Sequence, residues 1–323
     1  MTQQYLRKVS VAVGVAGGAG LDFSAFRCVF TVRRGDYQNP NTCDVRVYNL
    51  RDDTANAMAK NPNSEFTYLA LKAGYPGNYG LIFKGVIKQV RRGRVDQKDS
   101  YVEITAADGD EAYNFAAVST SLKAGAKPDD VLGVLLDAVK PFGITAGYSP
   151  KLESNGCVRG RVFYGMARDE LRDFAWDNDC AWSFQDNALT MIPFTSYVPG
   201  SVPVISPTTG LLGTPEQTTR GIEIRTLLNP NFKVGQLVKL DSSVVNRFRF
   251  DPSQGSLGSN LALQPLIKTN ADGLYYVMIA NHRGDTRGAA WWSDLICLAA
   301  DASIITIEQT NALTAQQPSL DRF

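Results

Sequence analysis

Short strand-like segments separated by turn-forming residues fill the chain from residue 5 to residue 107, and this pattern limits the fold more than any other feature. In residues 43–49 every second side chain is apolar, which is the period of a strand with one buried face. The preceding residues 34–41 are rich in Gly, Asp, Asn and Pro, which favour turns. The other predicted elements here are strands at 27–33, 65–72, 81–91 and 100–107 and a short helix at 53–60. About six short strands predict a small barrel or sandwich.

The pattern changes after residue 110. Residues 127–140 carry an apolar stripe at helical spacing, with Pro128 and two aspartates in the first turn and Pro141 and Gly143 after the end. These are ordinary start and stop signals of a helix. Residues 167–178 predict a second helix, and residues 181–192 a hairpin that turns at Asp186 and Asn187. Residues 110–195 are therefore predicted to form a small α+β unit.

A proline- and serine-rich linker at 193–207 precedes a second β region. We interpret residues 210–241 as a turn-rich loop, a strand, a tight turn and a second strand, in which Asn229, Pro230 and Asn231 set the turn between strands at 220–226 and 237–241. Further strands are predicted at 274–280 and 294–298, residues 249–260 as a polar loop, and the last residues as a polar tail. The chain is thus predicted to be mainly β with an α+β insertion. The predicted domains are 1–109, 110–195 and 196–305, followed by the tail 306–323.

Composition excludes several classes of protein. The chain carries 33 Lys and Arg against 32 Asp and Glu, whereas a dedicated nucleic-acid binder would show a strong basic excess. No apolar run approaches the roughly 20 residues that cross a bilayer, and the N-terminal residues lack the order of a signal peptide. We expect a chain that is made in a cytoplasm and does not insert into a membrane.

The five cysteines are scattered and form no C-x-x-C pair; they are Cys28, Cys43, Cys157, Cys180 and Cys297. Buried, reduced thiols are the favoured interpretation. A Cys28–Cys43 bridge across a hairpin is the open alternative.

No constellation in the sequence predicts catalysis, a cofactor or a metal. His282 is the only histidine. The sequence has no nucleophile elbow that would make it part of a catalytic triad, and no clustered cysteines that would complete a zinc site with it. We interpret its segment as a turn with Gly284 and Gly288, in which Asp285 pairs with Arg283 or Arg287. The glycine-rich residues 13–20 lack the Lys-Ser/Thr of a phosphate-binding loop. The adjacent acids complement helix starts; they are Asp108, Asp110, Glu111, Asp169 and Glu170.

Two features are candidates for an interface or a lumen. Residues 84–98 carry six basic side chains and one acid; they form either the solvated face of a hairpin or a basic rim for an acidic partner or passing nucleic acid. The candidate residues in this segment are Lys84, Lys88, Arg91, Arg92 and Arg94. Trp291 and Trp292 point to opposite faces of a strand, so one is predicted to enter the core and the other to face an interface.

Residues 206–241, residues 80–87 and the residues from His282 to Trp291 together resemble the hub proteins of contractile phage tails. This resemblance implies a homotrimeric ring with two tail-tube-like β-barrel domains per chain and a small α+β domain between them. Such a ring joins a hexameric tail tube protein to a trimeric central spike protein and contacts other baseplate proteins. Its channel passes the tape measure protein and then DNA, without sequence-specific binding. The implied location is the virion tail baseplate after assembly in the host cytoplasm, with no catalysis and no cofactor.

Two alternatives remain open. A tail-associated hydrolase of cell wall or glycan would depend on an acid such as Glu170 or Glu223. A tail-tube or distal-tail protein would form a hexamer instead of a trimer.

Overall fold

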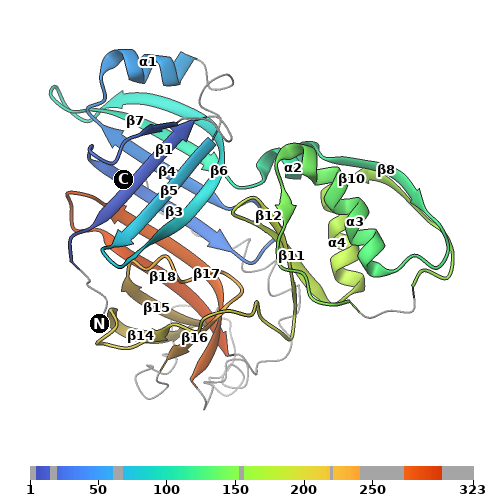
Figure 1. Ribbon diagram of the computed structural model, residues 1–323. Helices are drawn as coiled ribbons and strands as arrows, with labels where there is room; N and C mark the ends of the chain where they lie inside the picture. The colour runs from blue at the N-terminus through green and yellow to red at the C-terminus, as the bar shows by residue number, and fades with distance from the viewer. Residues whose placement is uncertain are drawn as a thin grey trace, which may run out of the picture.

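The structure is a computed structural model that describes residues 5–14, 20–60, 68–152, 156–218, 221–240 and 273–299. It has a body of two β-lobes and an arm that projects from one side of the body (Figure 1). The first β-lobe contains β1 (Lys8–Gly14), β2 (Gly20–Asp22), β3 (Cys28–Gly35), β4 (Thr42–Tyr48), α1 (Asp52–Lys60), β5 (Tyr68–Tyr75), β6 (Asn78–Arg94) and β7 (Ser100–Ala107). No helix in these ranges is long and apolar enough to span a bilayer.

The arm and the second β-lobe follow in the chain. The arm contains α2 (Asp110–Phe115), β8 (Ala117–Leu122), α3 (Pro128–Val139), the 3-10 turn η1 (Lys140–Phe142), β9 (Thr145–Ala146), β10 (Arg161–Met166), α4 (Ala167–Asp177), β11 (Cys180–Gln185) and β12 (Ala188–Pro193). The second β-lobe contains β13 (Val204–Ile205), β14 (Leu211–Thr218), β15 (Gly221–Leu227), β16 (Leu237–Leu240), β17 (Leu274–Asp285) and β18 (Trp291–Ala299).

One sheet of 13 strands runs through both β-lobes. Its main order is β14-β15-β18-β17-β3-β4-β7-β6-β5-β1-β2, and β16 and β13 branch from β17. The expectation of two barrels is wrong in this respect, because the sheet does not close. The physical reason is the seam between the lobes: β3 uses one edge for β4 and the other for β17, from Gly35 opposite Ile279 to Val29 opposite Asp285.

Each β-lobe nevertheless surrounds its own apolar core. The first core draws buried side chains from β1, β3, β4, β5, β6 and β7, among them Val11, Phe30, Val45, Leu71, Phe83 and Ile104. The core of the second β-lobe includes Ile224, Val238, Tyr275, Val277 and Leu295. The mainly β prediction is confirmed, and the alternating burial of β4 follows the predicted period of two residues.

Trp291 links the two lobes. It belongs to β18 of the second β-lobe, yet it lies in the core of the first, 2% exposed. Its ring meets Phe30 edge-on at 5.6 Å and Tyr75 at 6.5 Å between ring centroids. Trp292 points to the other face of the strand and is half-buried, as the alternation predicts.

The arm has the predicted helices and hairpin. α3 and α4 confirm the helices at 127–140 and 167–178, and Leu171, Phe174 and Ala175 of α4 are buried. Asp186 and Asn187 have φ of 57° and 64°, the left-handed geometry of a tight hairpin turn between β11 and β12. The two-stranded ribbon of β8 and β10 was not predicted, because its strands are joined by a long excursion through α3 and pair non-locally.

The second β-lobe corrects two expectations. Residues 211–218 form β14, paired with β15 through a bulge, where a loop was expected. β15 and β16 do not pair with each other: β15 lies between β14 and β18, and β16 lies beside β17. The segment around Asn229, Pro230 and Asn231 is therefore a crossover and not a hairpin turn. The predicted loop at 249–260 and the tail at 306–323 lie outside the described residues.

The alternative of a Cys28–Cys43 bridge is wrong. Both thiols are free and buried. In the β3–β4 register Cys28 lies opposite Val47 and Cys43 opposite Val32, so the two side chains are separated along the strands. Burial also raises the pKa of the Cys28 thiol to about 12, which keeps it protonated.

Replacing Trp291 with alanine should weaken the join between the lobes. Removing a large buried aromatic side chain from a core costs ~3–5 kcal/mol, which is the loss of unfolding free energy that we expect in urea titration. The matched control is Trp292→Ala, for which we expect less than ~1 kcal/mol, because its ring is half-exposed and contacts Arg225 on the surface. Equal losses for the two variants would contradict the assigned role of Trp291.

Candidate functional site

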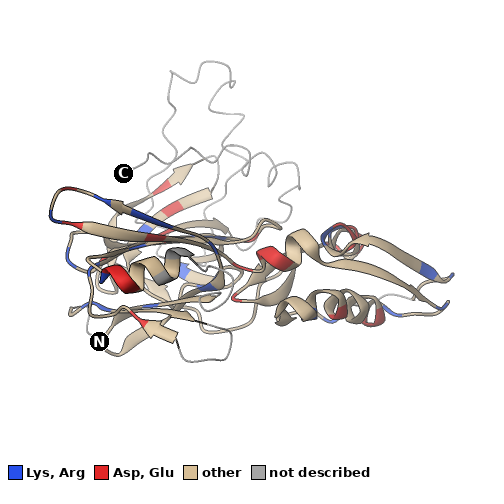
Figure 2. Ribbon diagram, turned by 90° about the horizontal axis from the view of Figure 1, so that it is seen from above, with Lys and Arg blue, Asp and Glu red and all other residues tan. Residues whose placement is uncertain are grey.

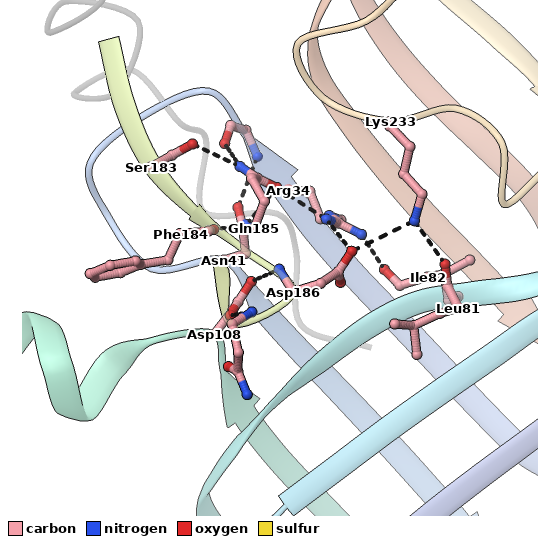
Figure 3. Close-up of polar contacts among 12 residues, drawn as sticks. Arg34, Asn41, Leu81, Ile82, Asp108, Ser183, Phe184, Gln185, Asp186 and Lys233 are labelled. Atoms are coloured by element: carbon pink, nitrogen blue, oxygen red, sulfur yellow. Dashed lines mark hydrogen bonds and ion pairs between the residues drawn. The ribbon is translucent and has the colours of Figure 1, made fainter. Parts of the chain in front are cut away.

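A polar junction joins the arm to both β-lobes (Figure 3). Its centre is Arg34, which lies at the end of β3, opposite Ala280 of β17, and is 4% exposed. The guanidinium donates from Nη1 to the carbonyl of Ile82 at 3.0 Å. It also donates from Nη2 to Gln185 Oε1 at 3.1 Å and pairs with Asp186 Oδ2 at 3.0 Å. One arginine thus holds β6 of the body and the β11–β12 turn of the arm.

Lys233 brings the second β-lobe to the same carboxylate. Its Nζ lies 3.6 Å from Asp186 Oδ2 and donates to the carbonyl of Leu81 at 3.1 Å. Burial raises the pKa of Asp186, but the charges of Arg34 and Lys233 more than offset this and hold it below its usual range. Burial and repulsion by Arg34 lower the pKa of Lys233. Arg34, with the shorter contact, is therefore the principal partner of Asp186.

Asp108 binds the backbone of the β11–β12 turn of the arm. Its two carboxylate oxygens accept the backbone N–H groups of Asp186 at 2.6 Å and Asn187 at 2.7 Å. Burial raises its pKa to about 6, despite the nearby charge of Arg34. The next residue, Gly109, has φ of 67°, and a Cβ there would lie 2.6 Å from the Phe184 ring. Only glycine fits this backbone where the body turns into the arm.

Asn41 completes the junction from the β3–β4 loop. Its Nδ2 donates to the carbonyl of Phe184 at 2.9 Å and to Gln185 Oε1 at 3.1 Å. Its Oδ1 accepts from the backbone N–H of Gly35 at 3.0 Å. Gln185 in turn donates to the carbonyl of Gly35 at 2.9 Å. Apart from Asp186 Oδ1, which is buried without a hydrogen-bond partner, these buried groups bond to one another, so the junction is a structural joint between three parts of the chain.

His282 lies within a strand, whereas a turn was expected for its segment. It belongs to β17, is 1% exposed, and its Nδ1 is 2.8 Å from Ser293 Oγ. Burial, together with the charges of Arg34 and Lys233, lowers its pKa to about 3. The imidazole is therefore neutral at ordinary pH and is shielded from any substrate in solution. Asp285 pairs with Arg27 at 2.7 Å, and not with the side chain of Arg283 or Arg287.

The acids that a hydrolase would require have structural partners. Glu170 lies 3.6 Å from Arg161, and Thr218 Oγ1 lies 3.4 Å from Glu223 Oε1. Asp110 and Glu111 stand in the first turn of α2 and Asp169 and Glu170 in that of α4, where they complement the helix dipole. In the described part of the chain no three His, Cys, Asp or Glu side chains gather as metal ligands would.

The basic side chains of residues 84–98 lie on the exposed outer side and at the tip of the β6–β7 hairpin, whereas residues 85–87 are buried. Three of its cations are paired within the chain: Lys88 with Asp110, Arg91 with Glu103, and Arg92 with Asp52. Acidic and basic positions are mixed along this part of the ribbon (Figure 2). Lys84 and Arg94 are also exposed. Of the predicted pair of tryptophans, only Trp292 reaches the surface; its Nε1 donates to Asp294 Oδ2 at 3.2 Å.

Sequence reasoning missed the residues that make the junction. Arg34 and Asn41 lie in what the sequence presents as a turn, and Lys233 in what it presents as a strand connection. One signal of the junction was present in the sequence, the Asp186–Asn187 turn. Its two left-handed residues fix the position at which the arm places the Asp186 carboxylate.

Two crystal structures share this architecture. The 43 kDa tail protein of prophage MuSo2 from Shewanella oneidensis matches 92% of this chain and 98% of its own length, with a TM-score of 0.57 and 8% identity. A tail protein from Neisseria meningitidis MC58 matches 93% of this chain and 99% of its own, with a TM-score of 0.54 and 11% identity. No protein-family profile and no curated protein matches the sequence. At such low identities the likeness extends to the fold alone: the chain has the fold of phage tail proteins.

Removing the shared carboxylate should destabilise the protein. Asp186→Asn leaves Arg34 and Lys233 without their common counter-charge. Breaking a buried pair in this way costs ~3–5 kcal/mol, and because Asp186 is 23% exposed we expect the lower end, about 3 kcal/mol, in chemical denaturation. The control is Asp173→Asn, which breaks the surface pair with Arg172 and should change stability by less than ~1 kcal/mol. A similar small effect at Asp186 would contradict the central position of this pair.

The neutral His282 predicts a pH dependence. On acidification the unfolded chain protonates His282 near its usual pKa of about 6.5, whereas the folded chain does not until about 3. The unfolded state then binds more protons, so His282 reduces stability as the pH falls through this window. Relative to His282→Gln, the wild type should lose about 2 kcal/mol of unfolding free energy between about pH 7.5 and pH 5. If the difference in unfolding free energy between the two proteins did not change with pH, the imidazole would protonate in the folded state as it does in the unfolded state.

Proposed function

We propose that this chain is a structural hub subunit of a phage tail baseplate, and that it forms a homotrimeric ring. The observation that carries the proposal is that a single chain with a phage tail fold contains two β-lobes, each with its own apolar core. Three copies present six lobes, which suits an adaptor between a hexameric tail tube protein and a trimeric central spike protein. The proposed channel passes the tape measure protein and then DNA, without sequence readout.

The rigid union of the lobes supports this role. β3 and β17 pair over seven residues, and Trp291 and Lys233 reach from the second β-lobe into contacts of the first. An adaptor that transmits force and symmetry between two assemblies requires fixed geometry between its lobes. The proposed partners also include other baseplate proteins, and the proposed location is the virion tail after assembly in the host cytoplasm.

The same features favour the hub over the two alternatives. A hexameric tube or distal-tail protein supplies one lobe per subunit to a sixfold ring, whereas this chain already holds two lobes in one sheet. A hydrolase needs an accessible pair of acids on the two sides of a cleft. Here the single histidine is buried and neutral, and Glu170 is engaged by Arg161. We therefore propose that the protein has no enzymatic activity.

The test is the mass of the purified chain in solution, by light scattering, combined with electron microscopy. We expect a particle of three 35.2 kDa chains with threefold symmetry and a central hole. A hexamer would favour the tube or distal-tail alternative. A stable monomer, also in the presence of its spike partner, would overturn the ring. Degradation of cell wall by the wild type that is lost in Glu170→Gln or Glu223→Gln would establish the hydrolase instead.

A further inference from the structure

The arm presents an uncharged sheet face that none of the described residues covers. In the ribbon of β8 and β10, Phe163 and Val118 point inward and are buried. Val162 lies opposite Ser121 and Tyr164 opposite Ser119 on the other side of the ribbon, where Val162 is 75% and Tyr164 85% exposed. The remaining members of this outer face are Ala117 and Met166. We call these six residues the outer face of the ribbon.

This outer face has the character of a contact surface. Single exposed apolar residues are common on proteins, but here a valine and a tyrosine stand side by side on one face with no charged residue among them. Tyrosine is enriched in the buried centres of protein interfaces, and charged residues are depleted there. The ribbon is also only two strands wide, and neither strand has a neighbour on its other edge in the described part of the arm.

Charge indicates what covers this face. The arm region 110–195 holds 12 Asp and Glu against 8 Lys and Arg, a net charge of −4. Residues 1–109 hold 15 Lys and Arg against 10 Asp and Glu, a net charge of +5. The arm and the first β-lobe are therefore electrostatically complementary, and such complementarity orients and accelerates association. The arm of one copy suits the first β-lobe of another.

The complementary surface lies on the side of the body away from the arm. Figure 1 shows that β1 begins on this side and that the β6–β7 hairpin turns on the same side. Tyr5 and Leu6, before β1, are 60% and 70% exposed, and Val95 at the hairpin tip is 61% exposed. The exposed Arg94 precedes Val95, and the exposed Asp96 and Lys98 follow it in the same turn. Exposed apolar and basic groups thus occur at both places on the side of the body opposite the acidic arm.

We propose that the outer face of the ribbon in one copy docks on the next copy, where β1 begins and the β6–β7 hairpin turns. This inference rests on the proposed ring and names the contact that holds it together. The two surfaces differ and lie on opposite sides of one molecule, so the contact is head-to-tail. Repetition of a head-to-tail contact closes a ring when the rotation between copies is a simple fraction of a turn.

The first experiment maps the contact by photo-cross-linking. A benzophenone amino acid placed at position 164 should link to peptides that contain residues 5–27 or 91–99 of a second copy, with at least a tenfold higher yield than the same group at position 133. Gly133 is the matched control, because it is exposed on α3, another surface of the arm, and a side chain there meets no atom within 4 Å.

The outcomes separate this inference from the proposed function. A trimer in which position 164 links only to other regions, or only to a different protein in assembled particles, would overturn the docking surface and leave the ring intact. A wild type that is monomeric under all conditions would overturn the ring, and the docking surface with it.

The second experiment introduces charge on the ribbon. The double variant Val162→Glu/Tyr164→Glu should raise the dissociation constant of the trimer at least 100-fold, whereas Gly133→Glu should leave it within threefold of the wild type. Both changed side chains are mostly exposed, so the far-ultraviolet circular dichroism and the unfolding midpoint of the monomer should match those of the wild type. An undiminished trimer in the folded double variant would refute the docking surface.

Discussion

The pairing of β3 with β17 is the contact on which the rest of this structure depends. It joins strands from opposite ends of the chain. Because β3 also pairs with β4 and β17 also pairs with β18, both strands are hydrogen-bonded along both edges. Unpaired backbone groups at the centre of the molecule would be costly. Because β3 is committed to β17, the first β-lobe cannot close on itself. The two lobes become one sheet, with Trp291 packed across the seam and Arg27 held by Asp285 beyond it. These contacts therefore fix the position of one lobe relative to the other.

The arm depends on the same seam. Arg34 is the residue of β3 that lies opposite Ala280, and from there its guanidinium reaches both β6 and the β11–β12 turn. Burying two cations beside one carboxylate has a desolvation cost that a well-packed apolar contact would avoid. What such a cluster supplies is directionality: the planar guanidinium of Arg34 donates to Gln185 and Asp186 in one arrangement only, and Asp108 fixes the backbone of the turn that carries them. The angle between arm and body follows from these contacts.

Sequence reasoning succeeded where the structure is local. The stripe in α3, the Asp186–Asn187 turn and the alternation of β4 each depend on residues close in the chain, and all are present. It failed where contacts join distant segments. Nothing in the pattern of residues 27–33 distinguishes a partner in β17 from one within the same lobe, and β14, with its glycine, proline and bulge, resembles a loop by composition. Arg34 and Lys233 are the two cations of the junction, yet each lies in a segment that looks like a polar connection, and only the tertiary fold decides that it is buried.

These constraints meet in the proposed ring. A head-to-tail contact produces a closed ring only if each copy is rotated by the same fixed fraction of a turn, and otherwise it produces an open filament. With the docking surfaces on the arm and on the far side of the first β-lobe, that rotation is set by the angle between arm and body. Arg34, Asp186 and Lys233 hold this angle, far from either surface. A loosened junction would let the rotation vary from copy to copy, so the buried ion cluster would govern the number of subunits in the ring without touching any neighbour.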